Sequence, residues 1–161
     1  MNMVKVYKPE ELREFIRKAQ ANTYTGGGKF EEIPERPGFK ELTFSEGDWF
    51  YRDSFAGWFK SRGMEVVRYK DEPVWATGYG GGMLGVDKQL THECNNFLKT
   101  VLTVDNKGFD SFRGPEYLQL GAWEYFYHQE GNLKDFWGHE TINWQQKPVF
   151  GQRIGGGLIT H

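Results

Sequence analysis

The chain has 161 residues with a net charge of −2 and 38% hydrophobic side chains, which fits one folded domain and excludes a disordered chain or one drawn to nucleic acid by bulk charge. Aromatic residues make up 17% of the sequence, so some rings are expected to line a cavity or reach the surface. The single cysteine, the lack of a membrane-length apolar run and an N-terminus without a signal-peptide stretch predict a cytoplasmic protein with no disulfide, no membrane partner and no direct nucleic-acid binding.

The first half of the chain predicts a helix followed by antiparallel strands. The helix is indicated by apolar side chains at helical spacing, namely Leu12, Phe15, Ile16 and Ala19. A loop rich in glycine and proline follows, from Thr25 to Gly38. Turn residues then separate four predicted strands, near residues 40–45, 48–54, 57–69 and 73–80.

The second half predicts the same order of elements. Its helix is indicated by apolar side chains at the same spacing, at Cys94, Phe97, Leu98 and Val101. A loop is predicted over residues 104–115. Four further strands are predicted near residues 116–120, 122–129, 132–144 and 148–156.

Three motifs of the first half recur in the second half at one constant spacing. The matching pairs are Gly63–Val67 with Gly138–Ile142, Pro73–Trp75 with Pro148–Phe150, and Gly80–Leu84 with Gly155–Ile159. Such self-similarity predicts an α+β fold made by tandem duplication of a helix plus a three- to four-stranded antiparallel meander, the two units being related by a pseudo-two-fold. We expect a single compact domain over residues 1–161, built of two repeats of about 8–86 and 90–160.

Strand alternation places one glutamate on the more apolar face of each half. Glu65 shares its face with Tyr69, and Glu140 shares its face with Trp144. A carboxylate among apolar side chains is costly unless a partner satisfies it. We therefore predict that Glu65 and Glu140 bind a cationic or hydrogen-bonding ligand in a cleft between the halves. The aromatic side chains expected to stack on this ligand are Trp75, Tyr79, Trp144 and Phe150.

A structural interpretation of the two glutamates stays open beside this functional one. Each carboxylate could accept backbone N–H groups of a turn or a glycine triplet, or pair with an arginine such as Arg62, Arg68 or Arg153. The glycine triplets at 80–82 and 155–157 likewise fit either a backbone cradle for a ligand or a close approach of two strands.

His139 stands in the second half where the first half has Met64, which makes it a candidate acid–base partner for Glu140. The four histidines show no zinc-ligand spacing, and no nucleophile or dinucleotide-binding motif occurs. We therefore expect no metal and no cofactor, and Glu140 and His139 are the only catalytic candidates.

Five segments spread over nearly the whole chain carry a family resemblance: Glu46–Ser54, Gly63–Val67, Pro73–Trp75, Phe136–Ile142 and Gly155–Ile159. Through them the chain resembles an uncharacterised bacterial and archaeal family, a domain of unknown function often fused to XRE-type helix-turn-helix regulators. The resemblance implies an effector-binding role, because domains fused to DNA-binding modules are commonly sensors. The sequence shows no helix-turn-helix segment, and the resemblance implies no catalytic residues.

Three functions follow as hypotheses. The first is an effector-type module that binds a small molecule in an aromatic cleft with acidic anchors. The second is a small hydrolase or isomerase that uses the Glu140–His139 pair. The third is a structural protein, such as a homodimer, whose exposed rings form the interface between copies. The sequence favours binding over catalysis.

Overall fold

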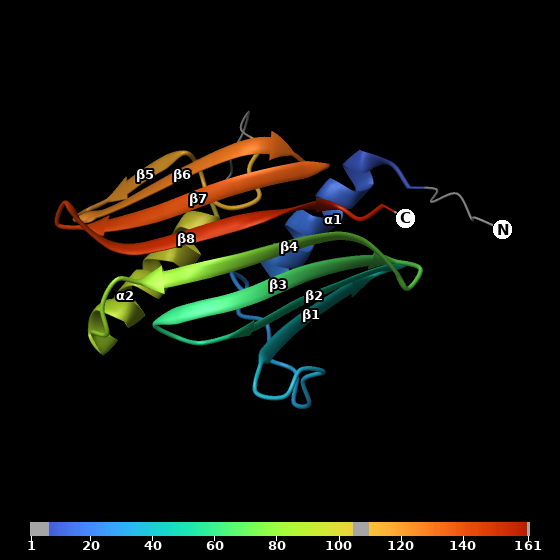
Figure 1. Cartoon of the computed structure of the whole chain (residues 1–161), viewed down its shortest axis with the longest axis horizontal. Coiled ribbons are helices and arrows are strands. Elements are labelled where there is room, and N and C mark those ends of the chain that lie inside the picture. The colour runs from blue at the N-terminus through green and yellow to red at the C-terminus, as the bar shows by residue number, and fades with distance from the viewer. Residues whose placement is uncertain (1–6, 105–109, 161) are drawn as a thin grey trace.

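The computed structural model describes residues 7–104 and 110–160, which form two helices and one antiparallel sheet (Figure 1). The helices are α1 (Pro9–Asn22) and α2 (Lys88–Leu102). The strands are β1 (Lys40–Glu46), β2 (Trp49–Ala56), β3 (Lys60–Tyr69), β4 (Glu72–Met83), β5 (Tyr117–Leu120), β6 (Trp123–Asn132), β7 (Asp135–Trp144) and β8 (Lys147–Leu158). The N-terminal residues 1–6, residues 105–109 of the predicted 104–115 loop, and His161 lie outside the described residues.

All eight strands belong to a single sheet, in the order β1-β2-β3-β4-β8-β7-β6-β5. The helices and strands lie where the periodicity predicts them, with ends shifted by a few residues. The predicted fold class, an α+β tandem duplication of a helix plus a meander with two units related by a pseudo-two-fold, is nevertheless wrong. The protein has a sheet-dominated fold with two short helices. The reason is that β4 and β8, the inner edges of the supposed units, pair with each other from Trp75 to Met83 and so satisfy their backbone groups in one continuous ladder.

The glycine triplets lie inside β4 and β8 and permit the close approach of these strands. A Cβ atom on Gly81 would stand 2.2 Å from the carbonyl oxygen of Gly151, and one on Gly156 would stand 2.2 Å from that of Ala76. Gly81 also has a φ of 154°, which side chains disfavour. Of the two interpretations of the triplets, close strand contact is therefore the one that the structure supports.

Both helices of the described residues lie on one face of the sheet, here called the inner face, and neither lies on the opposite, outer face (Figure 1). Helix α1 packs against β1 and β2, and α2 packs against β6. Helix α2 begins after Asp87, whose carboxylate accepts the backbone N–H of Leu90 at 2.8 Å, an N-cap that replaces a hydrogen bond missing from the first turn. None of the described helices is long and apolar enough to cross a membrane.

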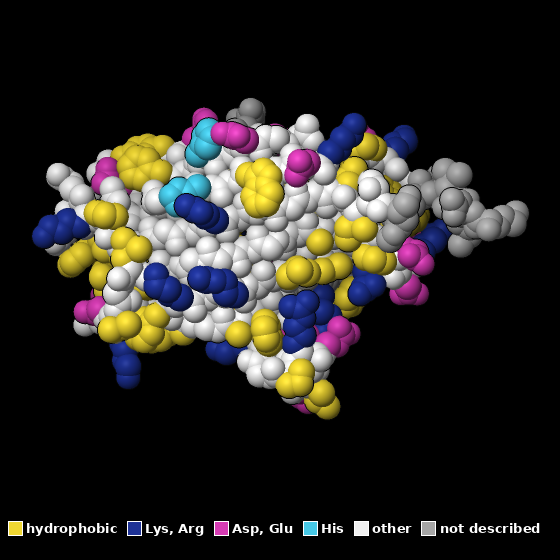
Figure 2. Space-filling view, in the orientation of Figure 1, with side chains coloured by type: hydrophobic (Ala, Val, Ile, Leu, Met, Phe, Trp, Pro, Cys, Tyr) yellow, Lys and Arg dark blue, Asp and Glu magenta, His cyan; other side chains and the backbone are white. Residues whose placement is uncertain are grey.

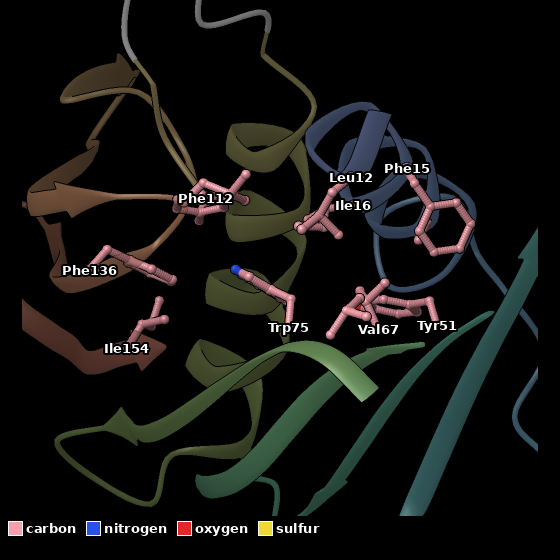
Figure 3. Close-up of a cluster of buried hydrophobic side chains, with 12 residues drawn as sticks. Leu12, Phe15, Ile16, Tyr51, Val67, Trp75, Phe112, Phe136 and Ile154 are labelled. Carbon is pink, nitrogen blue, oxygen red and sulfur yellow. The ribbon is translucent and has the colours of Figure 1, made fainter. Parts of the chain in front are cut away.

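The inner face carries two apolar clusters separated by polar side chains. Leu12, Phe15 and Ile16 of α1 pack on the first cluster, which surrounds Trp75 (Figure 3). The second cluster lies under α2 and contains Cys94, Leu98, Val101, Tyr125, Ile142 and Phe150. Burying each such large side chain contributes about 1.5–3 kcal/mol.

The polar band between the clusters follows from the order of residues along the strands. In β8, Gln152 stands between Ile154 of the first cluster and Phe150 of the second, and in β7 Glu140 stands between Phe136 and Ile142. Because every second residue faces inward, the chain places these polar groups under the helices, away from water.

Candidate functional site

A cavity of about 240 Å³ opens on the inner face, between the sheet, the segment after α1, and α2. Strands β2, β3 and β4 contribute Asp53, Glu65 and Tyr79 to its wall. Helix α2 contributes Asn95 and Lys99, one turn apart on the same helix face. Further lining residues with polar side chains are Tyr24, Lys40, Ser61, Arg113 and Gln152, so the cavity combines buried charges with aromatic and apolar walls.

Two acidic side chains oppose each other in this cavity. Asp53 and Glu65 are directly paired residues of β2 and β3, so both point to the inner face, where they are only 4% and 7% exposed. Burial, reinforced by the charge of Glu65, raises the pKa of Asp53 from 3.8 to about 7. Burial also raises the pKa of Glu65. Like charges at paired positions repel, and the pair relieves this by retaining a proton near neutral pH.

Neutral hydroxyl and amide donors orient these two carboxyl groups. The Tyr79 hydroxyl donates to Oδ1 of Asp53 at 2.7 Å. Glu65 accepts the Tyr51 hydroxyl at 2.8 Å and the Gln20 side-chain amide at 3.3 Å. Within the described residues no arginine or lysine forms a salt bridge with either acid, although the nearby charge of Arg113 partly offsets the effect of burial on the pKa of both.

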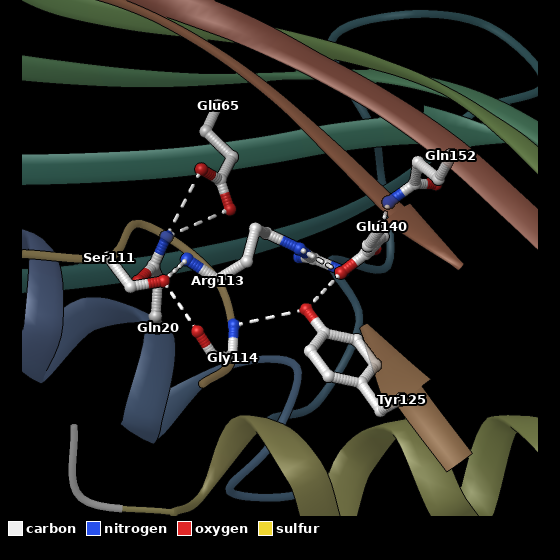
Figure 4. Close-up of polar contacts among 8 residues, drawn as sticks. All are labelled: Gln20, Glu65, Ser111, Arg113, Gly114, Tyr125, Glu140 and Gln152. Carbon is white, nitrogen blue, oxygen red and sulfur yellow. Dashed lines mark hydrogen bonds and ion pairs between the residues drawn. The ribbon is translucent and has the colours of Figure 1, made fainter. Parts of the chain in front are cut away.

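Glu140, in contrast, is fully engaged by the protein (Figure 4). Its carboxylate is 0% exposed and accepts Nε and Nη2 of Arg113 at 3.2 and 2.7 Å. The Tyr125 hydroxyl and the Gln152 side-chain amide add donors at 2.7 and 2.8 Å. Burial disfavours the charged form of Arg113, but the carboxylate of Glu140 outweighs this effect and holds the pKa of Arg113 well above the usual range. Glu140 thus anchors Arg113 at the cavity wall.

Several polar groups that line the cavity have no partner in the protein. Within residues 7–104 and 110–160, no hydrogen bond is made by the Tyr24 hydroxyl, the Asn95 side chain or Nη1 of Arg113. Burial raises the pKa of Tyr24, so its hydroxyl stays a donor at neutral pH. Among the described residues the only buried side-chain nitrogen or oxygen without a partner is Nε1 of Trp75, so these three groups are accessible from the cavity.

The predicted site residues fall into three groups. Glu65, Tyr79 and Phe150 line the cavity, and Glu140 adjoins it through its ion pair with Arg113. Trp75 does not reach it: its ring packs against Phe112 and Phe136, with Nε1 buried and without a partner. Trp144 lies beside Trp123, 6.2 Å between ring centroids, at the far end of β7.

His139 and Glu140 do not form a catalytic pair. They are consecutive residues of β7, so their side chains point to opposite faces of the sheet. His139 is exposed on the outer face, while Glu140 is buried on the inner face. An acid–base pair must lie within hydrogen-bond reach of one proton, and this geometry separates the two groups.

The outer face has a groove of its own, of about 620 Å³ (Figure 2). Its walls include Trp137, His139 and Arg153, and its floor includes Gly78 and Gly155. Trp137 is 69% exposed. The groove is larger than the inner cavity, but the charged side chains that line it, Glu130 and Arg153, are exposed. The inner cavity is therefore the better candidate site.

Sequence reasoning missed Asp53 and Arg113. The alternation of β2 does place Asp53 on the face of Tyr51, which is a usable signal, but its pairing with Glu65 depends on strand register. Nothing local marks Arg113, because it lies in the loop after α2, 27 positions from Glu140. The structural interpretation of Glu140 anticipated an arginine partner, and the partner is Arg113 rather than Arg62, Arg68 or Arg153.

Comparison with known proteins gives one match. A family model described as "Domain of unknown function (DUF5680)" matches residues 53–159, which is more than half of the chain. No curated protein and no solved structure matches the chain. The described residues contain no group of three or more His, Cys, Asp or Glu side chains that could hold a metal ion.

Proposed function

The chain belongs to this family of domains of unknown function, and we propose that it binds a small organic molecule with a cationic or hydrogen-bond-donating group in the inner cavity. The observation that carries this proposal is the pair Asp53 and Glu65, two buried carboxyl groups at the wall of a cavity that form no salt bridge within the described residues. Burying such groups costs free energy, which a ligand that donates hydrogen bonds to them would recover.

The residues that line the cavity favour a ligand that carries a hydrogen-bond donor. A carboxyl pair that retains one proton offers at least one anionic oxygen, which favours an ammonium or amidinium group over a carboxylate. Phe55, Trp58 and Phe150 also line the cavity. Rings of this kind hold the apolar body of a small ligand and attract cations to their faces.

The cavity is compact, which limits the ligand. Its volume of about 240 Å³ lies below the roughly 300–1,000 Å³ of typical drug-sized sites. An amine or amidine with one small ring or a short chain fits this size. The resemblance to domains fused to XRE-type regulators supports an effector role for such a molecule.

A thermal-shift assay tests the proposal directly. Benzylamine carries the expected cation, and benzyl alcohol and benzoate serve as neutral and anionic analogues. We expect benzylamine to raise the melting temperature most and benzoate least. At a concentration of about one hundred times its Kd, a ligand stabilises its protein by about 2.7 kcal/mol, a shift that the assay resolves.

Variants of the two acids make the assay specific. Asp53→Asn and Glu65→Gln should each weaken benzylamine binding by about tenfold or more, because a hydrogen bond to a charged group contributes about 1.5–3 kcal/mol. The matched control is Glu41→Gln, since Glu41 is also buried but lies at the outer face, bonded to Arg52, Ser54 and the backbone of Glu35 and Arg36. The proposal is wrong if all three variants lose benzylamine affinity equally, or if no amine raises the melting temperature of the wild-type protein.

A further inference from the structure

The charges that line the inner cavity are segregated by sign. Its acids are Asp53 and Glu65, on the strands of the sheet. Its bases are Arg113, Lys40 and Lys99. Glu140 neutralises Arg113 through two hydrogen bonds, so the charges left for a ligand are two acids at the buried wall and two lysines, Lys40 and Lys99, which are exposed at the mouth.

The two lysines are held at this mouth by aromatic rings and not by acids. The ammonium group of Lys40 lies 5.3 Å from the ring centroid of Phe30, and that of Lys99 lies 5.3 Å from that of Tyr24. Within the described residues neither lysine has an ion-pair partner. A cation on a ring face keeps its outward side free for an anion.

The lysines come from separate elements that meet only in the folded protein. Lys40 opens β1 opposite Phe55, on the same face as Asp53, while Lys99 lies on α2 one turn after Asn95. Both therefore border the same cavity from opposite sides. An anionic group at the mouth would face two positive charges, and a cationic group deeper inside would face two carboxyl groups.

We infer that the ligand is a small zwitterion, with its ammonium or amidinium group between Asp53 and Glu65 and its carboxylate or similar anion between Lys40 and Lys99. This inference rests on the proposed function and adds the second charge and its place. A monocation of the same length would satisfy the acids but leave the two lysines unpaired, so the site discriminates between a simple amine and an amino acid.

Calorimetric titration of the whole chain with matched compounds tests this inference. The zwitterions are β-alanine, γ-aminobutyrate, δ-aminovalerate and ε-aminocaproate, which span a range of charge separations. Each is compared with the amine that lacks only its carboxylate: ethylamine, propylamine, butylamine and pentylamine. At the length that fits, we expect the zwitterion to bind roughly three- to tenfold more tightly, the gain appropriate to partly exposed ion pairs.

The double variant Lys40→Gln/Lys99→Gln should remove this advantage without weakening the binding of the matched amine, because it takes away two positive charges that repel that cation. Lys88→Gln is the control, since Lys88 is exposed on the same helix but does not line the cavity. If benzylamine and the simple amines bind but no zwitterion binds more tightly, the inference is overturned and the proposed function survives. If no amine binds, both the inference and the proposed function are wrong. An equal loss for amines and zwitterions in the double variant would also overturn the inference.

Discussion

At the scale of single residues, the acid pair in the cavity lowers the stability of the folded protein. Asp53 and Glu65 are paired across β2 and β3 and both nearly buried, an arrangement in which repulsion and lost hydration act together. Hydrogen bonds from Tyr79 and Tyr51 orient the carboxyl groups without neutralising them. A stability cost at a cavity wall is what a binding site requires, because the ligand then recovers it.

The pKa of Asp53 predicts how stability depends on pH. It rises from 3.8 in the unfolded chain to about 7 in the folded protein, so the native state takes up a proton that the unfolded chain releases. The contribution of Asp53 to stability is therefore complete below about pH 4 and is lost as the pH rises through about 7. We expect Asp53→Asn to be increasingly more stable than the wild type across this range.

Urea denaturation at a series of pH values measures this difference. Asparagine keeps the oxygen that accepts the Tyr79 hydroxyl, so the variant changes charge and little else. Above neutral pH the gain should reach a plateau of a few kcal/mol. A difference that does not vary with pH would show that Asp53 is not a buried titrating group.

The ion pair of Arg113 and Glu140 gives a second prediction at this scale. Arg113→Met should destabilise the fold by about 3–5 kcal/mol, because it leaves the fully buried carboxylate of Glu140 without its counter-charge. Arg113→Met/Glu140→Gln should recover much of this loss, since no charge is then left unpaired. Chemical denaturation of both variants checks the expectation, with Arg153→Met as an exposed control. If Arg113→Met is no less stable than the control Arg153→Met, this prediction is wrong.

At the scale of elements, the segment after α2 joins the two apolar clusters. Phe112 packs in the first cluster, with its ring 4.4 Å from that of Phe136. One residue later Arg113 bonds Glu140, and the backbone N–H of Gly114 donates to the Tyr125 hydroxyl at 3.2 Å in the second cluster. A short irregular segment thus positions the arginine of the site through packing on both sides.

The two helices contribute differently to the cavity. Helix α1 supplies Gln20 to Glu65 from its last turn, so it orients an acid of the wall. Helix α2 places Asn95 and Lys99 on the wall itself while Cys94 and Leu98 pack in the core. Substitutions at Asn95 or Lys99 should therefore affect binding more than stability, whereas Leu98 is a core position.

At the scale of the whole molecule, the pairing of β4 with β8 makes one sheet of eight strands. Gly156→Ala should weaken this seam by about 1–3 kcal/mol, because the new methyl group meets the carbonyl oxygen of Ala76 and the Cα of Thr77. Gly151→Ala is the matched control in the same strand, where the nearest atom to an added Cβ lies 4.0 Å away.

Thermal denaturation of the two glycine variants decides the point. The control should stay within about 0.5 kcal/mol of the wild type. Equal stability of both variants would mean that the strands can separate at this position without cost.

Two expectations about the whole molecule stay predictions: a homodimer, and two repeats over residues 8–86 and 90–160. Light scattering of the protein in solution tests the first of them.

By itself, the sequence determined the elements and the orientation of their side chains. Helical spacing in Leu12–Ala19 and strand alternation around Glu65 and Glu140 are local properties, because a side chain's direction repeats with the backbone geometry of its own element. They correctly placed both glutamates on the buried face and put His139 on the other face from Glu140.

Only the tertiary structure decided which elements meet. The local pattern does not show which strand edges pair, so the continuous sheet replaced the predicted tandem units. It also does not show that Arg113 reaches Glu140 or that Asp53 opposes Glu65. These contacts join residues far apart in the chain, and their free energy depends on the burial and register that exist only once the sheet and helices have packed together.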